Sequence, residues 1–298
     1  ALAPLAAEIA PGAGVSVPFM IAVVLGGAFF GDNLSFISDT TIAATRSQGC
    51  DMADKFRANI IIALPAAIIT LVLYVAMSYG LADGAVQTSV DASPWLVLPY
   101  AVVIVTALMR VNVTIVLSLG ALIAFGMGLQ QGFGLLQLCG FMGGGIDGMG
   151  GLIVITLMSA GMLGLVKACG GIEWLIQSIT CGIRGMRGAE GCVAVLVGLV
   201  NLCTANNTVA IITVGSLSRE LARRFGIRPR KCASLLDTCS CVVQCLVPYG
   251  AQTLLATSLA GISPAAPFPY LYYPWALIVC VAVSVILPGR EEKTVRND

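Results

Sequence analysis

The sequence predicts an all-α, polytopic helical membrane protein with two structural repeats, each containing a re-entrant or broken-helix hairpin. Hydrophobic residues make up 58% of the chain and charged residues only 10%, with a mean hydropathy of +0.94. Soluble domains are roughly a quarter charged. Several apolar runs approach the roughly 20 residues that a helix needs to cross about 30 Å of hydrocarbon. One order of segments also occurs twice, which is typical of transporters built from repeats.

The first copy of this order opens the chain. An apolar arm at 15–30 runs into a polar patch at 31–41. A charged loop at 46–57 follows, and then a helix at 58–81 that carries Pro65. Because proline inside a membrane helix frees backbone groups, we expect a break or kink at this residue.

The second copy begins with two apolar runs, at 96–109 and 111–129. A glycine-rich stretch at 143–151 then leads into an apolar run at 152–166. Glycine is a poor helix former, so we expect Asp147, which lies among these glycines, to be a loop residue.

The remaining segments complete the second copy. Residues 170–188 are amphipathic and basic, which suits a helix at the membrane interface. An apolar arm at 192–202 meets a second polar patch at 204–208. The basic segment 219–231 is typical of a cytoplasmic loop by the positive-inside rule. The span 232–259 is polar in its middle and is predicted to be broken, and a last helix and a charged tail follow it.

These segments define the expected domains. We assign 1–92 to the C-terminal part of repeat 1, comprising its hairpin and the helix after it, 93–290 to repeat 2, and 291–298 to a polar tail. The chain starts at Ala1, and its second copy is much longer before the polar patch than its first. We therefore expect much of repeat 1 to lie upstream. Counting crossings makes the repeats parallel, and one additional crossing within 130–186 would make them inverted.

Several functional classes are excluded by composition. A net charge of +1 and 7% aromatic residues argue against nucleic acid as a partner. The 11 cysteines lack zinc-ligand spacing, and the chain has no histidine to complete a mixed site. Neither a GxSxG nucleophile motif nor a phosphate-binding loop occurs, so we expect that this protein is not an enzyme. We expect no cofactor beyond Na+ and H+ as transported or coupling ions.

The first polar patch carries the strongest prediction of chemistry. A carboxylate at membrane depth costs about 2.5 to 3.5 kcal/mol on insertion scales, so it is seldom placed there without a partner or a task. A broken helix also frees backbone carbonyls, which complete a shell around a cation. The patch thus predicts a site where Na+ and protons compete, the alternative being a simple polar loop. Its oxygen-bearing residues are Asp32, Asn33, Ser35, Ser38, Asp39, Thr40 and Thr41.

Two further groups of residues are candidates for the same site. The second patch offers Thr204, Asn206, Asn207 and Thr208. Their alternative role is to join helices, because neutral amides and hydroxyls do so within membranes. Asp237 and Thr238 in the broken span are candidates for a third contribution.

These residues carry a resemblance to a known family. GDNLSFISDTT at 31–41, with the charged loop after it, resembles the GDK-S-P-SDTT signature of the NhaC family of Na+/H+ antiporters. ANNT at 205–208 and LLDTCSCVVQCLVPYG at 235–250 resemble the second half of that family. The resemblance covers essentially the whole chain, as the last two thirds of a family member. Asn33 and Phe36 depart from the pattern, which often has Lys and Pro there, and Lys55 lies where relatives tend to carry His.

The resemblance implies a fold and a site. The fold is that of the wider ion transporter superfamily, in which two inverted repeats each carry a re-entrant hairpin. The implied hairpin tips are 38–40 and 206–208. The Na+ ligands expected from them are Ser38, Asp39, Thr40, Asn206, Asn207 and Thr208.

The function we expect is secondary active transport, with Na+ exchanged for protons between the two tips. The alternative is a Na+- or H+-coupled transporter of an amino acid or organic acid. A third hypothesis, from a different functional class, is a membrane scaffold or channel. The expected partners are the lipid bilayer and a small cation or small solute, with a homodimer left open. The expected location is the cell (inner) membrane, with several crossings.

Overall fold

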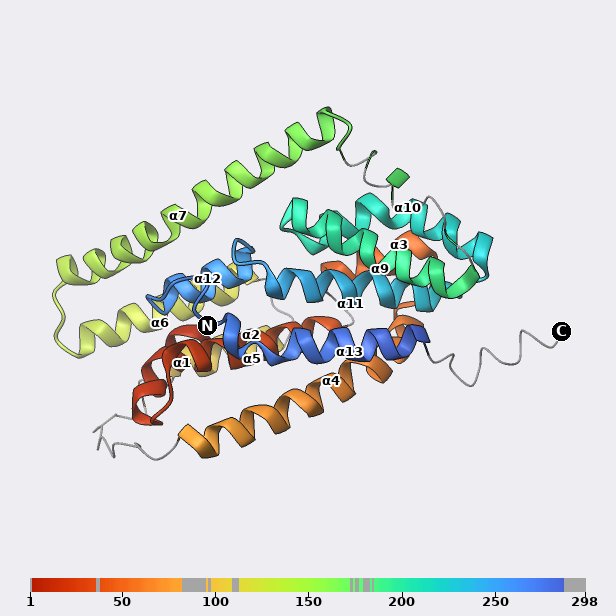
Figure 1. The fold of residues 1–298 in the computed structure, drawn as a ribbon. Helices are drawn as coiled ribbons and strands as arrows, with labels where there is room; N and C mark the ends of the chain where they lie inside the picture. Colours follow the sequence, from red (N-terminus) through yellow and green to blue (C-terminus); the bar gives the residue numbers. More distant parts are fainter. Residues whose placement is uncertain are drawn as a thin grey trace.

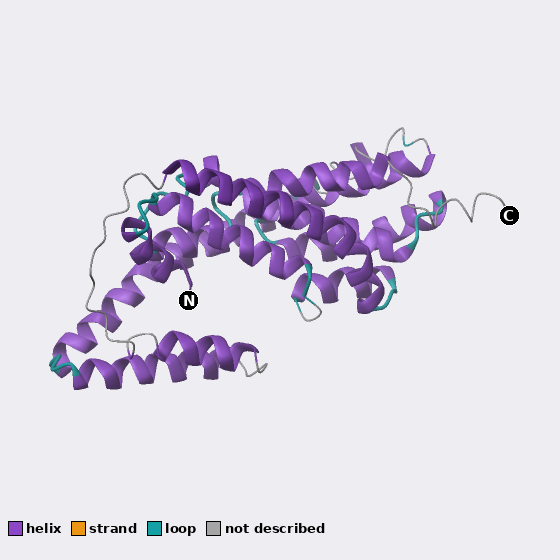
Figure 2. Ribbon diagram, turned by 90° about the horizontal axis from the view of Figure 1, so that it is seen from below, coloured by secondary structure: helices purple, strands orange, loops and turns teal. Residues whose placement is uncertain are grey.

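The computed structural model describes residues 2–35, 38–81, 95, 98–108, 113–171, 174, 177–178, 183 and 185–286. Every regular element in these residues is helical (Figure 2). The helices are α1 (Leu2–Gly12), α2 (Val17–Asn33), α3 (Asp39–Gln48), α4 (Met52–Leu81), α5 (Leu98–Leu108), α6 (Val113–Gln130), α7 (Leu135–Ala168), α9 (Gly185–Thr204), α10 (Asn207–Phe225), α11 (Pro229–Leu246), α12 (Ala251–Leu259), the short η3 (Phe268–Tyr270) and α13 (Tyr272–Ile286).

Length and composition allow three of these helical segments to cross a membrane, namely Met52–Ser78, Gly185–Thr204 and Pro229–Leu259. Shorter apolar helices accompany them, among them Val17–Asn33 and Tyr272–Ile286. The outer face of α4 is rich in exposed aliphatic side chains such as Ile61. Water would disfavour such a face, whereas lipid tails accept it. An all-helical, polytopic membrane protein is therefore confirmed at this coarse level.

Helix α11 is the centre of the fold. It packs against α9, α10, α3, α13, α4 and α2, and most of its residues are buried. In Figure 1 it runs beside α13 through the middle of the molecule, while α7 lies along one edge and contacts α12. The main hydrophobic core joins α11 to the inner faces of α2, α9, α10 and α13. Polar residues in the middle of α11, such as Asp237 and Thr238, are consequently buried among other protein groups.

The two polar patches are helix breaks of different kinds. Helices α9 and α10 pack against each other, so the second patch is the tip of a helical hairpin. Helices α2 and α3 do not pack along each other, because α3 packs on α10 and α11 instead. In Figure 1, α3 lies behind α9 and α10, well away from most of α2. The first patch is thus a break between two helices that do not pack along each other, and the hairpin and the repeat relation stay predictions.

The segment 232–259 is broken, as its polar middle predicts. Helix α11 ends at Leu246, and the next residue, Val247, is extended because it precedes Pro248. Helix α12 then starts at Ala251. Proline does not have this effect at Pro65, which lies inside the continuous helix α4.

Three expected loops are helical. The glycine-rich stretch 143–151 and Asp147 belong to α7, a single helix of 34 residues. Most of 46–57 belongs to α3 and α4, which leaves residues 49–51 as the connection. Most of 219–231 likewise belongs to α10 and α11. Helix formation in each segment satisfies backbone groups that loops would leave unpaired, and this outweighed residue propensity.

Some predicted segments cannot be compared with the structure. Nine of the 19 residues in the interfacial helix expected at 170–188 lie outside the described residues, and so does the whole charged tail.

Candidate functional site

At the first break, side-chain hydroxyl groups form hydrogen bonds with free backbone groups. Ser38 precedes α3 as its N-cap, and its Oγ accepts a hydrogen bond from the Thr41 backbone N–H at 3.3 Å. Ser35 Oγ accepts from the Ser38 N–H at 3.1 Å, and Thr41 Oγ1 donates to the Ser35 carbonyl at 2.9 Å. Capping residues of this kind satisfy the free N–H groups at the start of a helix. These contacts fix the start of α3 relative to the chain that leaves α2.

The second break also has an N-cap side chain, in this case that of an asparagine. Asn206 precedes α10, and its Oδ1 accepts from the Val209 N–H at 3.1 Å. Ala205, between α9 and α10, has a left-handed backbone with φ of 48°, uncommon for a residue with a side chain. Its carbonyl accepts a hydrogen bond from Gln244 Nε2 at 3.1 Å, so α11 holds this strained turn in place.

The two breaks meet at one cavity, which we call the break cavity. Its volume is about 540 Å³. Its lining residues are Ala28, Phe29, Asp32, Ser38, Asp39, Thr40, Asn206, Asn207, Thr208 and Gln252. The structure thus brings together all six residues expected to bind Na+, with Asp32 beside them. They come from two segments far apart in the sequence.

The charges around the break cavity suit a cation. Asp32 and Asp39 supply two carboxylates, and the described lining residues include no basic side chain. Asp39 is exposed, while Asn207 is 7% exposed. Hydroxyl and amide oxygens of the other lining residues can complete the shell of a small, hard cation. Helix ends with opposite partial charges also meet here. The negative C-terminal ends of α2 and α9 lie where the positive N-terminal ends of α3 and α10 begin.

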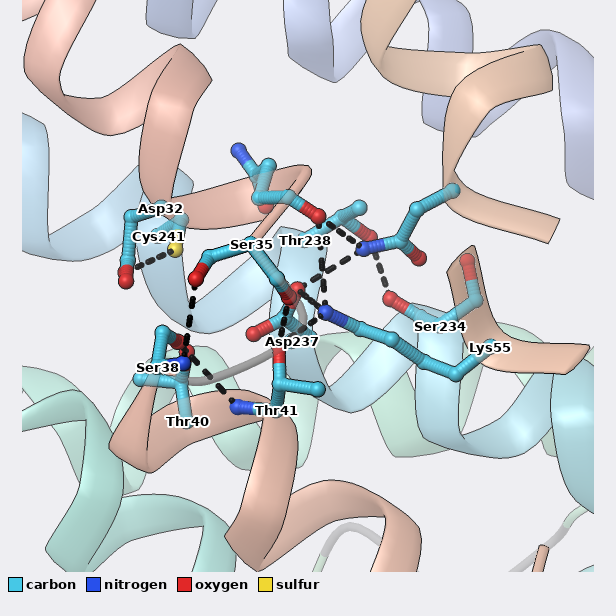
Figure 3. A network of polar contacts seen from close by, with 12 residues as sticks. Asp32, Ser35, Ser38, Thr40, Thr41, Lys55, Ser234, Asp237, Thr238 and Cys241 are labelled. Atoms are coloured by element: carbon cyan, nitrogen blue, oxygen red, sulfur yellow. Dashed lines mark hydrogen bonds and ion pairs between the residues drawn. The ribbon is translucent and has the colours of Figure 1, made fainter. Parts of the chain in front are cut away.

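Cys241 of α11 lies between the two breaks. Its Sγ donates to Asp32 Oδ2 at 3.4 Å, and Asn207 Nδ2 lies 3.9 Å from the same sulfur. Figure 3 shows this thiol pointing at Asp32. One side chain of the central helix therefore contacts a polar residue from each break.

The other predicted site residues lie outside the lining of this cavity. Ser35 and Thr41 close the first break, and Thr204 Oγ1 donates to the Asn206 carbonyl at 3.1 Å. Thr238 Oγ1 donates to the Ser234 carbonyl of its own helix at 2.8 Å. Asn33 Nδ2 donates to the Tyr273 hydroxyl at 3.0 Å. Asp237 is completely buried in an ion pair.

That ion pair joins Lys55 of α4 to Asp237 of α11. Lys55 Nζ is 2.6 Å from Asp237 Oδ2, and both side chains are 0% exposed. The same ammonium donates to Thr41 Oγ1 at 2.6 Å and to the Asn33 carbonyl at 3.4 Å. Asn59 Nδ2 donates to Asp237 Oδ2 at 2.8 Å and to the Asn33 carbonyl at 2.8 Å. Removing one partner of a buried pair typically costs about 3 to 5 kcal/mol.

Sequence reasoning missed Lys55, Asn59, Cys241 and Gln252. It placed Lys55 in a charged loop, whereas α4 starts before it, at Met52. A usable signal was the spacing of Lys55 and Asn59, which puts both side chains on one face of a helix, just before a long apolar run. Gln252 offered no such signal, because only the break after α11 brings it to the cavity, where Gln244 Nε2 donates to its Oε1 at 2.8 Å.

Comparison with protein families identifies one match along nearly the whole chain. The model described as the Na+/H+ antiporter family matches residues 1–79 and 82–288. No solved structure matches the chain.

Curated relatives are similar at low identity. The malate-2H(+)/Na(+)-lactate antiporter of Bacillus subtilis (strain 168) is 23% identical, over 93% of this chain and 65% of its own length. The Na(+)/H(+) antiporter NhaC of the same organism is 24% identical, over 94% of this chain and 68% of its own. The arginine/ornithine antiporter ArcD of Halobacterium salinarum (strain ATCC 700922 / JCM 11081 / NRC-1) is 20% identical, over 89% of this chain and 61% of its own. The chain thus spans about two thirds of the length of these relatives.

Proposed function

This chain belongs to the Na+/H+ antiporter family, and we propose that it forms part of a secondary transporter that exchanges Na+ for protons at the break cavity. The family is one of membrane transporters and not of enzymes, and the chain is a multi-pass membrane protein. One observation carries the proposal. Two polar breaks, distant in the sequence, supply carboxylate, hydroxyl and amide oxygens to a single cavity.

Asp39 is the central residue of the proposed exchange. A carboxylate binds either a metal cation or a proton, so Na+ and H+ compete for it directly. Asp39 is the first residue of α3, where the positive end of the helix dipole favours a negative side chain. Ser38, Thr208 and the neighbouring polar residues provide the neutral oxygens, and Asp32 provides a second carboxylate to the same cavity.

Alternating access gives this site its transport function. In transporters with broken helices, one group of helices rocks against another around a fixed site near the middle of the bilayer. Here the cavity walls come from α2, α3, α10 and α12, all of which contact or adjoin α11. We propose that movement of these walls exposes the cavity to one side of the cell membrane at a time.

A second candidate function is Na+- or H+-coupled transport of an amino acid or organic acid. The cavity of about 540 Å³ is far larger than one dehydrated ion and lies within the usual range for small-molecule sites. The N-terminal ends of α3 and α10 also border it, and helix N-termini favour anionic groups of a solute. Relatives named as lactate and arginine antiporters agree with this candidate.

Proton movement in lipid vesicles tests the proposal. We expect a Na+ gradient to drive proton movement in vesicles with the unaltered protein, and Asp39→Asn to reduce it to the level of empty vesicles, because the amide cannot exchange a proton. Asp54→Asn is the matched control, since Asp54 is 44% exposed and lies 3.9 Å from Arg57, outside the cavity. Unchanged exchange in Asp39→Asn would rule out its role.

The same vesicles distinguish the two candidate functions. Exchange that needs only Na+ and H+ supports antiport of the two ions. Exchange that starts only when an amino acid or organic acid is added supports the coupled carrier.

A further inference from the structure

The ammonium group of Lys55 lies in a cluster of oxygen atoms outside the lining of the break cavity. Its ligands are a carboxylate oxygen of Asp237, the hydroxyl of Thr41 and the backbone carbonyl of Asn33, at 2.6, 2.6 and 3.4 Å. Lys55, Asp237 and Thr41 are 0% exposed, and so is Asn33. These ligands come from α11, from the first turn of α3 and from the last residue of α2. The ammonium thus joins three helices at the first break.

The same ligands suit a metal cation. Carbonyls at the C-terminal end of a broken helix coordinate Na+ in membrane transporters, and a carboxylate supplies the balancing charge. The negative end of the α2 dipole adds to the attraction, because Asn33 is its final residue. Hydroxyl oxygens such as Thr41 Oγ1 are common partners in such shells. The Lys55 ammonium therefore carries the charge of a monovalent cation and has the kinds of ligand that such a cation binds.

We propose that Lys55 is a tethered cation, occupying an oxygen site that binds Na+ when the ammonium is removed. Asp237 is balanced by Lys55, whereas Asp32 and Asp39 line the break cavity without a basic side chain among its lining residues. The ammonium also links the first break to α11, because it contacts Asp237 of α11 as well as Thr41 and Asn33 beside the break. The inference does not need Na+/H+ exchange to be correct, because it concerns a separate cluster and is measured without transport.

The consequence for stability is specific. Lys55→Met removes the charge and keeps a side chain of similar length. It leaves the buried carboxylate of Asp237 without its cation, which is strongly unfavourable. A Na+ ion that enters the cluster restores the balance and binds the folded state only, so the protein becomes more stable as Na+ is added. Removing the carboxylate as well abolishes both effects.

Thermal unfolding of the purified protein tests this inference. The midpoint is measured in increasing NaCl, with choline chloride keeping the ionic strength constant. All variants carry Asp39→Asn, which weakens binding in the break cavity. We expect Lys55→Met to lower the midpoint by several degrees without Na+, and Na+ to recover most of that loss. Lys55→Met combined with Asp237→Asn is expected to show a higher midpoint than Lys55→Met alone and no recovery by Na+.

Two results would overturn the inference. One is a Lys55→Met variant with an unaltered midpoint, and the other is Na+ recovery that persists after Asp237→Asn. If Lys55→Met yields no folded protein, the double variant decides. Its folding supports the charge coupling, whereas its failure to fold contradicts it. The Asp39→Asn transport test has its own outcome, so this inference and the proposed function can fail separately.

Discussion

At the scale of single residues, Cys241 links the two halves of the site. Its thiol donates to Asp32 from the first patch and lies within 3.9 Å of Asn207 from the second. The side chain is 1% exposed. It therefore holds the Asp32 carboxylate in one orientation and contributes nothing to the outer surface.

We predict that Cys241→Ala weakens apparent Na+ affinity. A lost hydrogen bond to a charged group is worth about 1.5 to 3 kcal/mol, and a thiol bond lies below that range, so the loss is roughly threefold to tenfold. The measurement is the Na+ concentration that gives half-maximal exchange in vesicles. Cys239→Ala is the control, because Cys239 is buried on the same helix but, two residues away, lies on a different face from the side chain that contacts Asp32 and Asn207. Equal effects of both variants would show general loss of packing instead.

Individual site residues could be predicted where local chemistry dominates. Ser38 and Asn206 are helix caps, and their residue types already indicate a break in an apolar region. Asp237 could be identified as a candidate functional residue, because it is a carboxylate in an apolar span. Its partner, Lys55, could not be identified. The contact with Lys55 depends on the packing of α4 against α11, which no local pattern specifies.

At the scale of elements, the contact between α3 and α10 positions the two patches. A Cβ atom added at Gly215 of α10 would lie 2.6 Å from the Cβ of Ser47 on α3, so only glycine fits. Gln48 Nε2 also donates to the Gly215 carbonyl at 2.9 Å. Because the polar patches lie at the N-terminal ends of the same two helices, this contact sets the distance across the cavity.

We predict that Gly215→Val separates α3 from α10 and disrupts the site. Overpacking a tight contact costs about 1 to 3 kcal/mol, which should lower the unfolding midpoint and reduce Na+-driven exchange together. Gly31→Val is not a suitable control, because it lies beside Asp32. Gly191→Val is suitable, since a Cβ there meets nothing within 4 Å. Normal exchange by Gly215→Val would contradict the role of this contact.

The apolar helices could be predicted from the sequence, and the connections could not. Runs such as 111–129 match α6 within two residues, because membrane helices need long apolar stretches. The glycine-rich part of α7 and the charged ends of α4 and α10 were predicted as loops, since glycine and charge are typical of loops in water. In an apolar environment, backbone hydrogen bonding favours the helix regardless of such residues.

At the scale of the whole molecule, α11 joins every feature of the account. It supplies Asp237 to the buried ion pair, Cys241 to the two patches, and Gln244 to the strained turn at Ala205. Its own break after Leu246 brings Gln252 to the cavity wall. Movement of α11 relative to α3 or α10 would therefore change both the cavity and the ion pair. The two-repeat organisation and a homodimer stay predictions.

Equilibrium binding of radioactive Na+ to the purified protein tests the central claim, that both polar breaks share one cation site. We expect the unaltered protein to bind Na+ less tightly as the pH falls, because protons compete for the carboxylates. Asp39→Asn in the first break and Thr208→Val in the second should each weaken binding, while Asp54→Asn should not. Na+ binding that is insensitive to Asp39→Asn, or that depends on one break and not the other, would contradict the account.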